Sequence, residues 1–109
     1  MNKLGATVLI SARRKEELER VKKGCQNPDK IEIVPLDMAE PESTIKQVEK
    51  ILGERKDLPI DILVNNAGIS MRVSFLENDL VSDIKLMNVN LFSQIAISRV
   101  CISLSYIAH

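Results

Sequence analysis

The segment Asp61–Ser70, "DILVNNAGIS", passes from a short apolar run into two asparagines, an alanine and a glycine. The run Ile60–Val64, which overlaps its start, has the length and composition of a buried strand. The next four residues, Asn65–Gly68, stand where that strand would end. In open parallel α/β sheets, ligands bind beyond the carboxyl ends of the strands. The residues that follow each strand are therefore the first candidates for a functional site.

Strands and helices alternate along the whole chain. The apolar runs Ala6–Ser11, "ATVLIS", and Ile31–Leu36, "IEIVPL", predict two further strands, and Pro35 restricts the second to a strand end or an edge. Apolar residues recur at helical spacing in three stretches: Lys15–Cys25, Pro41–Gly53, and a long one from about Asn78 nearly to the C-terminus. This order predicts an α/β fold with a parallel sheet, built as one domain over residues 1–109.

Composition excludes several classes of function. Fifteen basic residues balance fifteen acidic ones, which argues against a nucleic-acid partner or an anionic membrane surface. Cys25 and Cys101 lack the spacing of a metal or redox motif, so we expect no metal, a reducing compartment and two small buried hydrophobic residues. No apolar run reaches membrane-spanning length, which favours a soluble intracellular chain.

Three short motifs follow the three predicted strands. They are Ser11-Ala12-Arg13-Arg14, Asp37-Met38 and Asn65-Asn66-Ala67-Gly68. Together with "NVNL" at Asn88–Leu91, they resemble the classical short-chain dehydrogenase/reductase (SDR) family from about Asn2 to Gln94. The wording of "LISARR", "LERVK" and "PLDM" is most similar to the branch that contains the dehydrogenase/reductase member 7 proteins. The resemblance implies a partial three-layer Rossmann-type domain that binds NAD(P).

The resemblance also implies roles for the residues after the first two strands. In the family, arginine after the strand that corresponds to the first one predicted here accommodates the 2′-phosphate of NADP(H). This is the expected role of Arg13 and Arg14 beside Ser11. Asp37 matches an aspartate that accepts a hydrogen bond from the adenine amino group. From the residues alone, Arg14 is equally a solvated charge at a helix start, and Asp37 is a common turn residue.

The asparagines carry the remaining implied roles. Asn65, Asn66, Ala67 and Gly68 would form a wall of the cofactor site, where amides bind hydroxyl groups and small residues permit close approach. The bland alternative is a strand cap followed by a glycine turn. Asn90 matches the helix asparagine of the catalytic tetrad, which bends its helix and holds a water of the proton relay; the glycine that usually follows three residues later is Ser93 here.

Other parts of the family pattern do not occur in these 109 residues. We find neither the glycine-rich turn nor the catalytic serine and Tyr-x-x-x-Lys pair, since the fourth residue after Tyr106 would be residue 110. In the family's strand order 3-2-1-4-5-6, the missing first strand would lie between the first and third strands predicted here. We therefore expect a fragment or truncated isoform, lacking that strand and the C-terminal half.

The resemblance leaves three functional interpretations open. The first is an NADP(H)-dependent oxidoreductase of carbonyls or secondary alcohols, inactive as this chain alone. The second is a non-catalytic module that forms a homo- or heterodimer with a full-length SDR through the helix from Asn78. The third is a residual nucleotide-binding protein that uses Arg13 and Asp37. The resemblance does not identify the substrate, and several longer members are anchored to the endoplasmic reticulum membrane.

Overall fold

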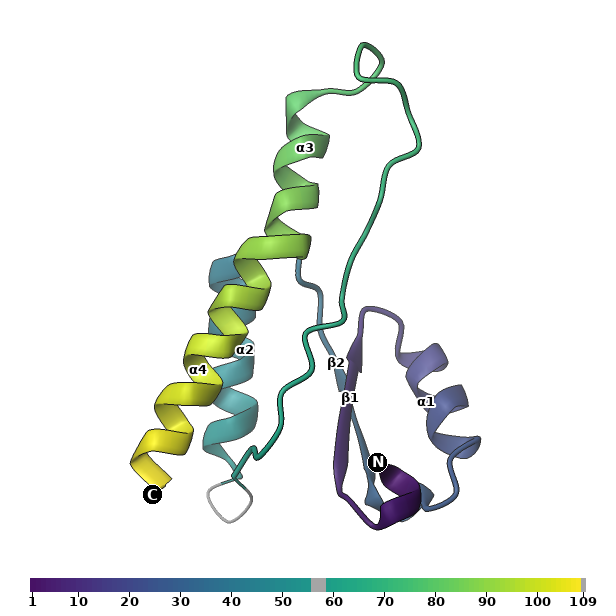
Figure 1. Ribbon diagram of the computed structural model, residues 1–109, viewed down its shortest axis with the longest axis vertical. Coiled ribbons are helices and arrows are strands. Elements are labelled where there is room, and N and C mark those ends of the chain that lie inside the picture. Colours follow the sequence, from purple (N-terminus) through teal and green to yellow (C-terminus); the bar gives the residue numbers. More distant parts are fainter. Residues whose placement is uncertain (56–58, 109) are drawn as a thin grey trace. The chain divides into compact units, whose positions relative to one another are not determined.

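The computed structural model describes residues 1–55 and 59–108. They form two compact units, Met1–Asp37 and Met38–His109. Each unit is described by itself, and its elements can be followed in Figure 1.

The first unit is a two-stranded parallel sheet with one α-helix. Its elements, in chain order, are the 3-10 helix η1 (Asn2–Leu4), β1 (Val8–Ala12), α1 (Lys15–Lys23), the 3-10 helix η2 (Pro28–Lys30) and β2 (Ile31–Pro35). The strands pair from Val8 with Ile31 to Ala12 with Pro35, which confirms the two predicted strands and their parallel direction. Pro35 is the last residue of β2, as its missing donor requires.

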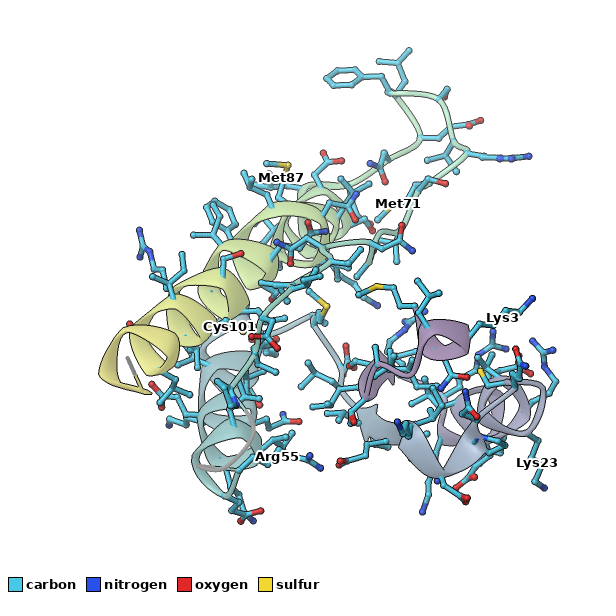
Figure 2. All side chains as sticks on the ribbon, turned by 60° about the horizontal axis from the view of Figure 1, so that its bottom comes forward. Lys3, Lys23, Arg55, Met71, Met87 and Cys101 are labelled. Atoms are coloured by element: carbon cyan, nitrogen blue, oxygen red, sulfur yellow. The ribbon has the colours of Figure 1, made fainter. Side chains whose placement is uncertain are left out.

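Helix α1 and strand β2 share the core of this unit. Leu18, Ile31 and Leu36 are buried there, while Val21 on the predicted apolar face of α1 stays exposed. The only ion pair of α1 that the described residues show joins Arg20 to Glu17 at 3.0 Å. The lysines Lys3 and Lys23 point away from the ribbon in Figure 2, which fits a solvated outer surface.

Two asparagines hold the start of the chain to the loop before β2. Asn27 donates its backbone N–H to Asn2 Oδ1 at 2.9 Å, and the side-chain amide of each donates to the backbone carbonyl of the other at 3.0 Å. Lys30 Nζ donates to the Gly5 carbonyl at 2.9 Å, and Gly5 adopts a φ of 89° that favours glycine. These contacts fix the turn that leads into β1.

The second unit consists of helices and one long connection. Its elements are α2 (Pro41–Gly53), α3 (Leu80–Met87), the π-helical turn η3 (Asn88–Phe92) and α4 (Ser93–Ala108). The last three form one continuous rod, and α2 lies beside α4 in the same direction (Figure 1). Both helices predicted in this part of the chain are confirmed, with Pro41 in the first turn of α2.

Helices α2 and α4 pack against each other, and each carries a fully buried hydroxyl group that is hydrogen-bonded. Thr44 and Ser93 are fully buried, with Val48, Ala96 and Val100 also buried in the same unit. Ser93 Oγ donates to the Met38 carbonyl at 2.7 Å, and Thr44 Oγ1 donates to the Glu40 carbonyl at 2.9 Å. The serine that stands at the family's glycine position is therefore accommodated through a hydrogen bond.

The third predicted strand is wrong. Ile60–Val64 is not a strand in this structure, and the side chains of Ile62, Leu63 and Val64 are 64%, 40% and 68% exposed. A strand needs a hydrogen-bonded neighbour, and the only sheet among the described residues is the β1–β2 pair. Residues 59–79 instead form a connection that contains only bends and turns before Asp79 caps α3.

The cap of α3 is a single side chain. Asp79 Oδ1 accepts a hydrogen bond from the Ser82 N–H at 2.7 Å, and this bond lowers the pKa of the exposed carboxyl. Asp83 adds a second acidic residue in the first turn, so α3 begins where the sequence changes from loop to apolar periodicity.

Within residues 1–55 and 59–108, no helix combines the length and apolar character needed to cross a membrane. The same residues hold no cluster of three or more His, Cys, Asp or Glu placed to bind a metal. Cys101 is buried, and burial raises the pKa of its thiol, whereas Cys25 is half-buried and contacts the Val21 carbonyl.

We predict that Ser93→Ala destabilises the second unit by about 1–2 kcal/mol, because the Met38 carbonyl loses its donor inside the helix contact. Ser103→Ala is the matched control, since Ser103 is exposed on the same helix and its replacement should change stability by less than about 0.5 kcal/mol. Urea unfolding followed by circular dichroism measures both. Equal effects of the two substitutions would contradict the assigned role of the buried hydroxyl.

Candidate functional site

The carboxyl edge of the first unit gathers four of the predicted site residues. Ser11 is the penultimate residue of β1, and Arg13 follows its last residue. Because Ala12 pairs with Pro35 and the Leu36 N–H donates to the Ala12 carbonyl at 2.9 Å, Asp37 follows at the same edge. The parallel pairing thus brings the residues after both strands to one end of the sheet, as expected.

The two arginines at this edge are exposed cations. Arg14 is the N-cap residue of α1, with extended backbone angles of φ −95° and ψ 109°, and its side chain makes no capping hydrogen bond. Neither Arg13 nor Arg14 forms an ion pair with any carboxylate that the structure describes. Two guanidinium groups without a protein partner, adjacent in sequence at a strand end, suit a doubly charged anion such as a phosphate monoester.

In the second unit, Asn90 holds the polar segment that follows residues 60–64. Its Oδ1 accepts a hydrogen bond from the Ile69 N–H at 2.7 Å, and its Nδ2 donates to the Ile69 carbonyl at 2.8 Å. The carboxamide therefore occupies both backbone groups of one residue, as a neighbouring strand would do. Asn90 and Asn65–Gly68, predicted as parts of one site, belong to the same local structure.

Two residues that the sequence interpretation did not assign extend this contact along the helix. Gln94 Nε2 donates to the Ala67 carbonyl at 2.5 Å, and Asn65 Nδ2 donates to Ser98 Oγ at 3.0 Å. Together with the bonds of Asn90, these contacts form what we call the amide ladder, which joins residues 65, 67 and 69 to residues 98, 94 and 90.

The spacing of the amide ladder follows from simple geometry. Two residues of extended chain advance roughly 6.6 Å, and four residues of α-helix advance about 6.0 Å, so an extended segment can meet one helix face at every second residue. The signal was present in the sequence: Asn90, Gln94 and Ser98 recur every four residues in a largely apolar helix. This spacing indicates a row of polar side chains on one helix face that bonds to a neighbouring backbone segment, rather than an interruption of the helix.

The helix is irregular at Asn90. Residues Asn88–Phe92 form a π-helical turn, in which the Ser93 N–H donates to the Asn88 carbonyl five residues earlier. π-turns inside α-helices occur frequently at functional sites. A widened turn with Asn90 at its centre therefore stands where the family resemblance implies a bend.

No contact in the described structure requires a glycine at position 68 or holds the Asn66 side chain by a hydrogen bond. A Cβ placed on Gly68 would lie 3.6 Å from Asn90 Oδ1, which is ordinary contact, so the described structure has room for alanine there. Asn66 is exposed and forms no hydrogen bond with any described residue. Its amide is therefore available to a ligand, and a need for glycine at position 68 would have to come from the ligand side.

The two groups of predicted residues lie in different units. Ser11, Arg13, Arg14 and Asp37 belong to the first unit, and Asn65–Gly68 with Asn90 belong to the second. The structure brings the members of each group together. That the two groups bind one dinucleotide remains a prediction.

Comparison with known proteins identifies the family of this chain. The profile of the family described as "short chain dehydrogenase" matches residues 1–105. The chain is 38% identical over 109 residues to "Dehydrogenase/reductase SDR family protein 7-like" of Anopheles gambiae, covering 90% of this chain and 32% of that protein. It is 35% identical over 104 residues to "Dehydrogenase/reductase SDR family member 7" of Mus musculus, covering 91% and 30%.

A solved structure gives the same result for the fold. The crystal structure of a short-chain dehydrogenase from Streptomyces avermitilis superposes with a TM-score of 0.78 at 26% sequence identity, covering 94% of this chain and 36% of that one. The α/β prediction and its Rossmann-type assignment are thereby confirmed. The chain spans about a third of the length of the relatives that it matches. With nearly its whole length matched by one family profile, this chain belongs to the short-chain dehydrogenase family.

Proposed function

We propose that this chain carries part of the dinucleotide site of an NADP(H)-dependent short-chain oxidoreductase. The bound cofactor would supply or accept the hydride that interconverts a carbonyl and a secondary alcohol. The residues of the chain would bind and orient that cofactor. The observation that carries the proposal is the pair of hydrogen bonds between Asn90 and Ile69, because it holds the residue after Asn65–Gly68 beside the asparagine that the family resemblance assigns to the catalytic tetrad.

The arginines support the preference for NADP(H). Both guanidinium groups are exposed at the end of β1 and unpaired among the described residues, so no protein carboxylate has to be displaced when a phosphate arrives. A free 2′-phosphate on the adenosine ribose provides two or more acceptor oxygens for them. Asp37, exposed at the same edge, has the carboxylate oxygens that would accept from the adenine amino group.

Asn90 would act on the nicotinamide side through its position. One Nδ2 proton and one Oδ1 lone pair are used by Ile69, which leaves one donor and one acceptor for a water of the proton relay. Asn66 and the free Oδ1 of Asn65 are further polar groups of this wall, suited to ribose hydroxyl groups. These polar groups of the second unit would suit the ribose hydroxyl groups of a nicotinamide dinucleotide.

A second candidate, pairing with another SDR chain, is favoured by an apolar row on the continuous rod. Its members are 41–77% exposed, and Met87 is labelled among them in Figure 2. The row consists of Leu80, Val81, Ile84, Met87 and Leu91. An apolar row of this length on a helix surface is typical of a helix that packs against a partner. We propose a second copy of this helix, or that of a full-length SDR, as the partner.

We predict that NADPH raises the melting temperature of the chain more than NADH does, because Arg13 binds the 2′-phosphate. Arg13→Ala should weaken NADPH binding about 10- to 100-fold, the loss of one charge-assisted hydrogen-bond set, and should leave NADH binding unchanged. Arg72→Ala is the control, since Arg72 is exposed in the other unit. Equal affinities for the two cofactors would exclude the role assigned to Arg13.

The 109 residues contain no Tyr-x-x-x-Lys pair, which supplies the proton to the carbonyl in the family pattern. We therefore predict that the purified chain oxidises no NADPH above the blank when it is incubated with a panel of ketones. Absorbance at the nicotinamide band gives the measurement. Robust turnover would mean that the chain holds a general acid other than the family's tyrosine.

For the pairing candidate, we predict that Ile84→Asp shifts the chain from dimer to monomer in sedimentation velocity, because the carboxylate would be desolvated in an apolar contact. Lys85→Ala is the control on the neighbouring exposed position. A wild-type chain that is already monomeric at high micromolar concentration would exclude the homodimer.

A further inference from the structure

We propose that Gln94 and Ser98 are positioning residues of the dinucleotide site, which hold the segment 65–69 at one place along α4. The consequence for cofactor binding rests on the proposed function, whereas the contacts themselves are properties of the free chain. Neither residue belongs to the motifs on which the family resemblance rests. Both would act through Asn65 and Ala67 rather than by touching the cofactor.

The segment needs such support because regular structure does not provide it. Residues 59–79 contain no helix or strand, and Ile62, Leu63 and Val64 just before the segment are largely exposed. An extended segment without a neighbouring strand loses order unless other groups satisfy its backbone. The amide ladder supplies those groups from one rigid helix.

Gln94 contributes a donor that an apolar side chain of equal length cannot replace. Its Nε2 meets the Ala67 carbonyl, the backbone group directly before Gly68. Asn90 then fixes Ile69, the residue directly after Gly68. Gly68 is therefore held from both sides, which sets the place of the backbone that a dinucleotide would approach.

Ser98 determines which way the Asn65 amide faces. Its hydroxyl proton is committed to the Gln94 carbonyl at 2.8 Å, so Ser98 Oγ can only accept from Asn65. Asn65 must therefore turn its Nδ2 toward the helix and its Oδ1 away from it. A ligand consequently meets an acceptor at Asn65, which suits a hydroxyl donor such as a ribose hydroxyl group and not a phosphate oxygen.

Few titratable residues occur in the two segments that meet at the contact of Gln94 with the Ala67 carbonyl. No residue of 65–69 is titratable. Arg99 is the only charged side chain of α4, and it lines a groove between α4 and α2 together with Glu49. Cys101 and Tyr106 are the other titratable residues of that helix. A glutamate introduced at position 94 would therefore have no titratable partner within residues 65–69.

The test is hydrogen exchange at the Ile69 amide, measured by NMR in the 109-residue chain, alongside the affinity for NADPH. Gln94→Met removes the donor at constant length and should accelerate exchange at Ile69 about three- to tenfold. Ser98→Ala should do the same and should weaken NADPH binding by a similar factor. Gln47→Met is the control, because Gln47 donates to Ser43 Oγ on the exposed surface of α2.

Gln94→Glu distinguishes positioning from general destabilisation. Below the pKa of the glutamate, its protonated carboxyl can donate to the Ala67 carbonyl and should restore wild-type exchange and affinity. Above that pKa, the carboxylate faces a carbonyl oxygen and both should be worse than in Gln94→Met. A pH-independent effect of Gln94→Glu would overturn the proposal, because a side chain that only fills space would not respond to protonation.

The remaining outcomes separate the two proposals. Exchange at Ile69 that is the same in Gln94→Met, Ser98→Ala and Gln47→Met overturns the positioning role. Faster exchange with unchanged NADPH affinity overturns its link to the cofactor site. Faster exchange in a chain whose wild type binds neither NADPH nor NADH supports the positioning of residues 65–69 while overturning the proposed function.

Discussion

The second unit depends on one carboxamide. Asn90 Oδ1 accepts a hydrogen bond from the Ile69 N–H and its Nδ2 donates to the Ile69 carbonyl, so one carboxamide satisfies both backbone groups of this residue. Because the π-turn Asn88–Phe92 centres on Asn90, the helix widens where the contact is made. Ser93, the next residue along the helix, donates a hydrogen bond to the Met38 carbonyl at the start of the unit. Removal of the carboxamide would leave two backbone groups without partners.

The elements with strong periodicity could be predicted from the sequence. Helices α1, α2 and the rod from Asn78 follow from apolar spacing, proline at a first turn and glycine at an end, all of which are local signals. Strands β1 and β2 were equally readable, because each has its partner within the chain. The run Ile60–Val64 has a similar composition, but none of the residues that the structure describes pairs with it, so local propensity did not suffice there.

The candidate site was predictable where residue identity carries the chemistry. Arginines after a strand and asparagines before a glycine are recognisable from residue type alone. Parallel pairing brings the first group to one edge of the sheet, and the bonds of Asn90 bring the second group together. Gln94 and Ser98 were missed because their role lies in spacing relative to a distant segment. A hydroxyl or amide on a helix has many possible partners, and the sequence does not specify which carbonyl it meets.

The contacts of the amide ladder differ in how well they prevent segment 65–69 from shifting along the helix. Backbone N–H and C=O groups are the same at every residue, so the bonds of Asn90 and Gln94 would survive a slip of the segment by two residues. The Asn65–Ser98 pair is the one rung among the four contacts that joins two side chains, and a slip would break it. This pair therefore gives the ladder its register: the other rungs supply cohesion, and one hydroxyl makes a single alignment the preferred one.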